Sequence, residues 1–119
     1  MTYRVERAED TDRDLDAIFD FLFESYQALG EDADGAFERA SRRLLAIEDT
    51  MASLGRMPHQ GTLRPDLGEA LRNVTKERAI FYCEVDDQVR CVRVLAVFYG
   101  GEDHQRKMLI RLLGGAPPS

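Results

Sequence analysis

RAIFYCEVDDQVRCVRVLAVFYG, residues 78–100, contains two runs of β-branched and aromatic residues joined by the polar turn DDQ. Runs of this composition on either side of a short turn predict a β-hairpin with strands at 78–85 and 89–99. The preceding run ALRNV, residues 70–74, is separated from the hairpin by TKE. We therefore expect a three-stranded antiparallel meander in the second half of the chain.

The two hairpin strands lack a clearly polar face. Side chains alternate between the two faces of a strand, and here the alternation places apolar residues on both. On the first strand, Ala79, Phe81, Cys83 and Val85 oppose Ile80, Tyr82 and Glu84; on the last, Cys91, Leu95, Val97 and Tyr99 oppose Val92, Val94, Ala96 and Phe98. Such a hairpin is expected at the centre of a sheet, with helices over one face and either a partner segment or the C-terminal tail over the other.

The first half of the chain predicts a strand followed by two helices. Alternation over residues 2–8 indicates a short strand, and Thr11 with Asp14 resembles a capping box that begins a helix. That helix keeps one apolar stripe up to Gly30, and a second stripe of the same period ends at Gly55. Two long helices joined by a short linker are expected to fold back on each other as an antiparallel hairpin.

A loop rich in proline and glycine at 55–69 and a short C-terminal helix at 102–113 complete the pattern. The element order β-α-α-β-β-β-α predicts an α+β fold, in which an N-terminal strand and a long antiparallel two-helix hairpin pack on a small, mostly antiparallel sheet. Because 44% of the 119 residues are hydrophobic and 32% are charged, residues 1–119 are expected to form a single folded domain.

The charge distribution argues against a general nucleic-acid binder. The net charge is -6, with 6 Lys/Arg against 14 Asp/Glu in residues 1–55 and 10 against 8 in residues 56–119. Proteins that neutralise many phosphates are normally basic, so direct nucleic-acid binding is not expected. The sequence shows no signal peptide or membrane span, which favours a cytoplasmic location. There Cys83 and Cys91, expected to face each other across the hairpin, would stay reduced as buried thiols.

Three arginines of the predicted sheet, Arg72, Arg78 and Arg93, are the main candidates for binding an acidic group. Arg72 and Arg78 flank a tight turn and are expected to converge at one end of the sheet. Guanidinium groups placed there could hold a phosphate or an acidic partner. The competing interpretation is that each arginine is an ordinary solvated residue paired with a nearby glutamate.

The sequence contains no catalytic motif. It has no Gly-rich phosphate loop, no His/Cys spacing for a metal and no nucleophile elbow, so no cofactor and no metal are expected. His59 and His104 are interpreted as surface residues. Arg72, Arg78 and Tyr99 could assist an RNA cleavage, which needs a base, an acid and charge stabilisation, but only the last is well supplied.

Apolar residues also occur beyond what one buried face requires. Phe21 lies about 120° from the centre of the stripe of its helix by helical geometry, and Met108, Leu109 and Leu112 make the C-terminal helix apolar on all sides. Such residues indicate either a partner-binding surface or burial in a compact core.

The ordered set of these motifs resembles the RelE/ParE superfamily of toxins from bacterial type II toxin–antitoxin systems. The matching features are Pro58 and Gly61 in the loop after the helices, the LR pair at 71–72, the Arg-led strand at 78–82 and the final strand ending at Tyr99. The resemblance covers nearly the whole chain and implies the RelE/ParE fold. It also implies a cognate, ParD-like antitoxin, whose extended and helical segment wraps the toxin in a hetero-oligomer.

The superfamily has two branches. RelE-like members cut messenger RNA on the ribosome with Lys/Arg residues and a terminal Tyr or His, whereas ParE-like members lack that set and are associated with inhibition of DNA gyrase. The absence of paired lysines from the loop and the YGGED ending make this chain resemble the ParE-like branch, which implies a non-enzymatic gyrase inhibitor. A metal-independent endoribonuclease and a non-toxic interaction module are the alternatives. The residues expected to bind partners are Phe21, Arg72, Arg78, Arg93, Tyr99, Met108, Leu109 and Leu112.

Overall fold

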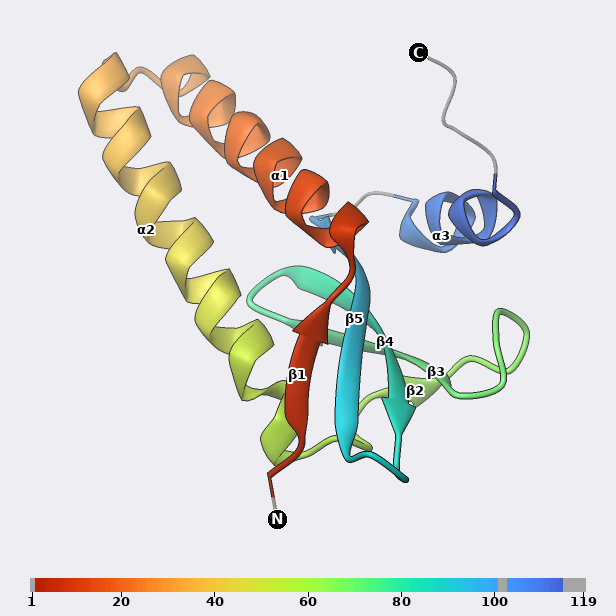
Figure 1. Ribbon diagram of the computed structural model, residues 1–119. Helices are drawn as coiled ribbons and strands as arrows, with labels where there is room; N and C mark the ends of the chain where they lie inside the picture. Colours follow the sequence, from red (N-terminus) through yellow and green to blue (C-terminus); the bar gives the residue numbers. More distant parts are fainter. Residues whose placement is uncertain (1, 101–102, 115–119) are drawn as a thin grey trace.

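A computed structural model describes residues 2–100 and 103–114 and confirms the α+β fold (Figure 1). Two long helices lie over one face of a five-stranded sheet, and a short C-terminal helix lies on the opposite side. The elements are β1 (Arg4–Arg7), α1 (Glu9–Ala28), α2 (Ala33–Ala52), the 3-10 helix η1 (Ser53–Arg56), β2 (Thr62–Leu63), β3 (Leu71–Lys76), β4 (Ala79–Asp86), β5 (Cys91–Tyr99) and α3 (His104–Leu112).

The strand order is β1-β5-β4-β3-β2, in which β1 runs parallel to β5 and the other neighbours are antiparallel. The predicted hairpin therefore lies at the centre of the sheet, and β1 and β2 form its edges. β2 lies within the stretch that the sequence predicts to be a loop. None of the helices in the described residues has both the length and the apolar character needed to cross a membrane.

The start of α1 differs from the prediction. The helix begins at Glu9 after Ala8, which offers no side-chain cap, so Thr11 and Asp14 do not form a capping box. Both residues are buried against β5 instead: the Thr11 hydroxyl donates to the Val94 carbonyl (2.9 Å) and the Asp14 carboxylate accepts from the Val97 N–H (3.0 Å). Asp14 satisfies the Val97 N–H beyond the point where β1 ends, because a buried amide needs a partner, and Thr11 adds a second donor to the Val94 carbonyl, which also accepts from the Ala8 N–H.

A β-bulge in β5 corrects the predicted faces of that strand. Tyr82 pairs with Ala96 and Cys83 pairs with Val94, so Leu95 is the extra residue between them. A bulge shifts the alternation by one residue. The helices therefore pack on Val92, Val94, Val97 and Tyr99, while Leu95, Ala96 and Phe98 belong to a second core with Leu71, Ile80, Tyr82 and Met108.

The two cysteines do not face each other. Cys83 pairs with Val94, whereas Cys91 pairs with Asp86 three residues further along the hairpin, and only Cys83 belongs to the core under the helices. Both are free and buried, as expected for reduced thiols. Burial in apolar surroundings raises the pKa of Cys83 to about 12.

We expect Cys83 to resist alkylation in the folded protein. With a pKa of about 12, only about one thiol in ten thousand is ionised at pH 8, and the thiolate is the reactive form. Iodoacetamide at pH 8, followed by peptide mass spectrometry, should modify Cys83 at least about a hundredfold faster in urea than in buffer. Equal rates in the two conditions would show that the thiol is accessible in the native state.

Candidate functional site: an open sheet edge and its groove

The outer edge of β1 is open for hydrogen bonding. Arg4 donates its N–H to the Arg90 carbonyl (2.9 Å) and Ala8 donates to the Val94 carbonyl (2.8 Å), so these amides point toward β5. Backbone groups alternate in direction along a strand, and the N–H and C=O of Val5 and Arg7 therefore point away from the sheet. An edge of this kind can accept another strand.

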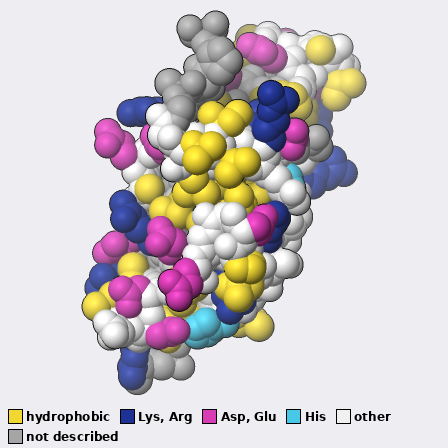
Figure 2. Space-filling model, turned by 90° about the vertical axis from the view of Figure 1, so that its right-hand side faces the viewer, with side chains coloured by type: hydrophobic (Ala, Val, Ile, Leu, Met, Phe, Trp, Pro, Cys, Tyr) yellow, Lys and Arg dark blue, Asp and Glu magenta, His cyan; other side chains and the backbone are white. Residues whose placement is uncertain are grey.

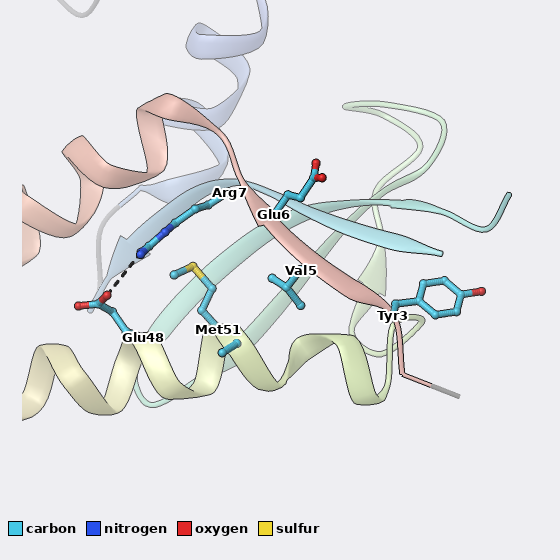
Figure 3. A pocket seen from close by; sticks show the side chains of 7 residues that line it. Tyr3, Val5, Glu6, Arg7, Glu48 and Met51 are labelled. Carbon is cyan, nitrogen blue, oxygen red and sulfur yellow. Dashed lines mark hydrogen bonds and ion pairs between the residues drawn. The ribbon is translucent and has the colours of Figure 1, made fainter. Parts of the chain in front are cut away.

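A groove of about 370 Å³ runs between this edge and α2 (Figure 3). Val5 from β1 and Met51 from α2 point into it, and Arg7 reaches across toward Glu48 at one end. The remaining lining residues are Tyr3, Glu6 and Ala52. The groove thus combines an apolar floor with charged residues at its rim, a combination that suits an extended peptide better than a small polar molecule.

Each end of the groove is closed by contacts between distant segments. At one end, Arg7 lies 3.4 Å from the Glu48 carboxylate and 3.5 Å from that of Asp12. At the other end, the Tyr3 N–H donates to the Gly55 carbonyl (2.8 Å), which brings η1 against the start of β1. The ion pairs of Arg7 are exposed and weak, so an incoming chain can displace them at little cost.

Tyr3 is held by a cluster of polar side chains beyond the closed end. The Asp87 carboxylate accepts from the Tyr3 hydroxyl (2.7 Å) and lies 2.8 Å from Nε2 of His59. The hydrogen bond from Tyr3, followed by that of His59, lowers the pKa of Asp87. His59 is half exposed, as the sequence predicts, and it connects the loop after η1 to the β4–β5 turn.

The predicted arginine cluster does not form. Arg72 pairs with Cys83 in the sheet, whereas Arg78 lies in the β3–β4 turn, beyond Lys76. At about 3.3 Å per residue, the four steps from Arg72 to Lys76 span about 13 Å of backbone along β3, and Arg78 lies beyond them. Arg72 also donates to the His59 carbonyl (2.8 Å) at the groove end of the sheet. The convergence expected from the sequence is therefore wrong, because the strand continues through TK before it turns.

Arg78, Tyr99 and Phe21 do lie at one end of the sheet. Tyr99 pairs with Ala79, the Gly100 N–H donates to the Arg78 carbonyl (2.9 Å), and the Phe21 and Tyr99 rings are 6.2 Å apart. Phe21 is 57% exposed and Arg78 is exposed. These two residues remain available to a partner, which is their predicted role.

Arg43 of α2 is a residue of this end that the sequence reasoning missed. Its guanidinium donates to the Tyr99 hydroxyl (3.2 Å), to the Glu77 carboxylate (3.0 Å) and to the Glu77 carbonyl (2.9 Å). It thereby holds the β3–β4 turn, in which Glu77 and Arg78 both adopt positive φ values of 55° and 60°. In the sequence, Arg43 could have been recognised by its place between Ala40 and Ile47, at the edge of the apolar stripe of α2.

The residues of β5 and α3 that the sequence predicts to bind a partner are partly buried and partly exposed. Met108 is only 1% exposed and packs in the second core, so the prediction that it contacts a partner is wrong. Leu109 and Leu112 are 44% and 41% exposed. Arg93 is exposed and lies between Glu6 and Glu84 in the sheet register, the arrangement expected for an ordinary solvated cation.

RNA cleavage needs a base, an acid and charge stabilisation at one phosphate, and Arg72, Arg78 and Tyr99 do not come together to supply them. Arg72 pairs with Cys83, four residues along β4 from the Ala79–Tyr99 pair, and the Tyr99 hydroxyl is engaged by Arg43. His104 is likewise occupied, because its Nδ1 lies 2.8 Å from the buried Tyr82 hydroxyl. Among the described residues, no group of three or more His, Cys, Asp or Glu is placed to hold a metal ion.

Solved chains from toxin–antitoxin systems share this arrangement of a two-helix hairpin over a mixed sheet. The chain is similar to a solved chain of the chromosomal ParDE toxin–antitoxin system of P. aeruginosa, with 21% identity and a TM-score of 0.60 over 83% of this chain and 97% of the other. It is also similar to a chain of the RelBE2 toxin–antitoxin complex of Mycobacterium tuberculosis, with 18% identity and a TM-score of 0.60 over 86% and 95% of the two chains.

A mutant of the E. coli toxin RelE in its free state is a more distant match, with 12% identity and a TM-score of 0.52 over 93% of this chain and 97% of that toxin. No protein-family model and no curated protein matches the sequence. The RelE/ParE fold expected from the sequence motifs is therefore confirmed by structure.

Proposed function

We propose that this protein is the toxin of a type II toxin–antitoxin module and that a cognate antitoxin neutralises it. The observation that carries the proposal is the open β1 edge beside an apolar groove, on a fold shared with chains from the ParDE and RelBE2 systems. An extended antitoxin segment would pair with the outward N–H and C=O groups of Val5 and Arg7. Its side chains would alternate between the groove floor and solvent.

The location of this edge changes the docking hypothesis drawn from the sequence. The apolar hairpin β4–β5 is covered by α1 and α2 on one face and occupies the interior of the sheet. The antitoxin would therefore complete the sheet at β1 rather than lie on the hairpin itself. Arg78 and Phe21, at the far end of β4 and β5, would then face the cellular target or a second part of the antitoxin.

For the target, we favour binding and inhibition of DNA gyrase without catalysis. The separation of Arg72 from Arg78 and Tyr99 supports this choice over RNA cleavage, since charge stabilisation and proton transfer must act on one phosphate. The acidic surface, with a net charge of -6, is also poorly suited to the phosphate-rich ribosome.

Induced expression in bacteria tests the proposal. We expect growth arrest that is reversed by co-expression of the cognate antitoxin, sought first in the neighbouring reading frame. Purified protein should inhibit supercoiling by gyrase and leave messenger RNA on translating ribosomes intact. Specific message cleavage would replace gyrase with the ribosome as the target, and unaffected growth at full expression would identify a non-toxic interaction module.

A further inference from the structure

The turn between β3 and β4 has a strained backbone that α2 holds in place. Glu77 and Arg78 have φ values of 55° and 60° and are enclosed by the pair between Lys76 and Ala79. A two-residue hairpin turn of this kind is normally Asn-Gly, because a Cβ disfavours the left-handed conformation. The Arg43 guanidinium donates to the Glu77 carboxylate (3.0 Å) and carbonyl (2.9 Å), and Figure 1 shows the turn extending toward α2. Strain that a second element maintains points to a function for the side chains of the turn.

Two cations of this turn are unpaired. Lys76 and Arg78 are exposed, and within residues 2–100 and 103–114 neither side chain makes a hydrogen bond or an ion pair. Glu77, which lies between them in the sequence, is paired with Arg43 and therefore does not cancel their charge. In a protein whose net charge is -6, two unpaired cations at one turn create a place where a negative group gains attraction.

An exposed aromatic ring lies close to these cations. Lys76 pairs with Ala79, and Ala79 pairs with Tyr99, so the three residues form one row on the helix side of the sheet. Because neighbouring strands are about 4.8 Å apart, the two ends of the row are about 10 Å apart. The Tyr99 ring lies 6.2 Å from that of Phe21, which is 57% exposed. Phe21, Lys76 and Arg78 therefore form a surface, which we call the turn surface, that one short segment can cover.

We propose that the turn surface binds an acidic segment of a protein partner, whose apolar side chains contact Phe21 and whose carboxylates lie near Lys76 and Arg78. This inference rests on the proposed function and names the chemistry of the partner that Arg78 and Phe21 would face. Val94 is the last residue of β5 that pairs with β1, and Tyr99 lies beyond it at the end of the strand. The turn surface can therefore be occupied while another chain pairs with β1.

A protein segment fits the turn surface better than RNA does. A peptide with two carboxylates beside an apolar residue matches two cations beside Phe21. RNA carries a negative charge at every nucleotide, and the acidic remainder of this protein would repel the charges that Lys76 and Arg78 do not neutralise.

Two labelled ten-residue peptides test the charge preference directly. One carries two glutamates and two phenylalanines among serines and glycines, and the other has lysines in place of the glutamates. Fluorescence anisotropy with the purified full chain should show the glutamate peptide binding at least about tenfold more tightly. Equal or tighter binding of the lysine peptide, or binding of neither, overturns the proposal. Binding of a labelled single-stranded RNA of ten nucleotides in place of the glutamate peptide overturns it as well.

Two variants locate the contact. K76E/R78E reverses the two cations, Phe21→Ser removes the exposed ring, and each should weaken binding of the glutamate peptide at least about tenfold. R56E/R106E makes the same change in net charge at two exposed arginines elsewhere and should leave the affinity unchanged. Unchanged affinity in both K76E/R78E and Phe21→Ser refutes the site. An equal loss in R56E/R106E also refutes it, because the peptide would then respond only to net charge.

A further control addresses apolar binding elsewhere on the molecule. Figure 2 shows hydrophobic side chains gathered on the side that carries α3, where Leu109 and Leu112 are exposed. L109S/L112S should bind the glutamate peptide as the parent protein does, and a tenfold loss in this variant would place the peptide on α3 and contradict the proposal. These readouts use neither toxicity nor an antitoxin, so the peptide can bind even if growth arrest is never observed.

Discussion

Replacing Asp14 by alanine is expected to lower the free energy of unfolding by about 3 kcal/mol, because it leaves the buried Val97 amide without a partner and leaves the Arg111 guanidinium only its 3.9 Å ion pair with Asp10. The Asp14 carboxylate accepts from the Val97 N–H and from two nitrogens of Arg111, and the Asp14 side chain is only 9% exposed. Arg111 keeps 30% of its side chain exposed, which limits the loss to the lower part of the range for buried pairs.

Urea denaturation followed by circular dichroism measures this loss. Asp16→Ala, an exposed position on the same helix, serves as the matched control and should change stability by less than about 0.5 kcal/mol. Because Asp14 connects α1 to both β5 and α3, the variant should also make α3 more sensitive to proteolysis. A loss below about 1 kcal/mol would mean that water replaces the carboxylate, and that the contacts of His104, Met108 and Arg111 with other residues are enough to hold α3.

Gly55→Ala is expected to destabilise the protein by about 3 kcal/mol through overpacking. A Cβ at this position would lie 2.1 Å from the Tyr3 carbonyl oxygen and 3.1 Å from Cγ2 of Val5. The Tyr3 oxygen is a backbone atom, which cannot move aside as a flexible side chain does. The start of β1 must shift, and the closed end of the groove would shift with it.

Gly68→Ala provides the comparison, since its Cβ would meet only side-chain atoms of Leu71, at 3.3 Å and beyond. We expect that change to cost less than about 1 kcal/mol. Thermal unfolding of both variants distinguishes the two positions. Equal stability of Gly55→Ala and the parent protein would show that β1 is not packed tightly against η1 in solution.

Much of the fold could be predicted from the sequence because it follows from local patterns. The two helices keep a 3.6-residue apolar period, and the strands after residue 70 are β-branched and aromatic, so both kinds of element were recognised within a few residues. Local pattern also explains the wrong prediction for Thr11 and Asp14: their spacing fits a capping box, and nothing local shows that β1 ends early and leaves the Val97 N–H to be satisfied by Asp14.

The bulge and the open edge could not be predicted because both depend on pairing between distant segments. Leu95 breaks the alternation only because of its register against β4, and β1 becomes an edge only because it pairs with β5. The candidate site follows from these long-range contacts. Arg72 and Arg78, in contrast, were predicted to converge because the sequence places the turn at residues 75–77, whereas β3 extends to Lys76 before the chain turns.

The most direct test of the central claim compares Val5→Pro with Val5→Ala. Proline removes the outward N–H and places a ring carbon at the open edge, while an edge strand tolerates it because the ladder to β5 uses the amides of Arg4 and Ala8. Alanine loses the same packing in the groove but keeps the N–H. Both should fold, as judged by circular dichroism.

Isothermal titration with the cognate antitoxin then gives the answer. If the antitoxin adds a strand to β1, Val5→Pro should bind at least about tenfold more weakly than Val5→Ala, through a lost hydrogen bond and a steric block. Equal affinity of the two variants would contradict the claim that the open edge of β1 is the docking site.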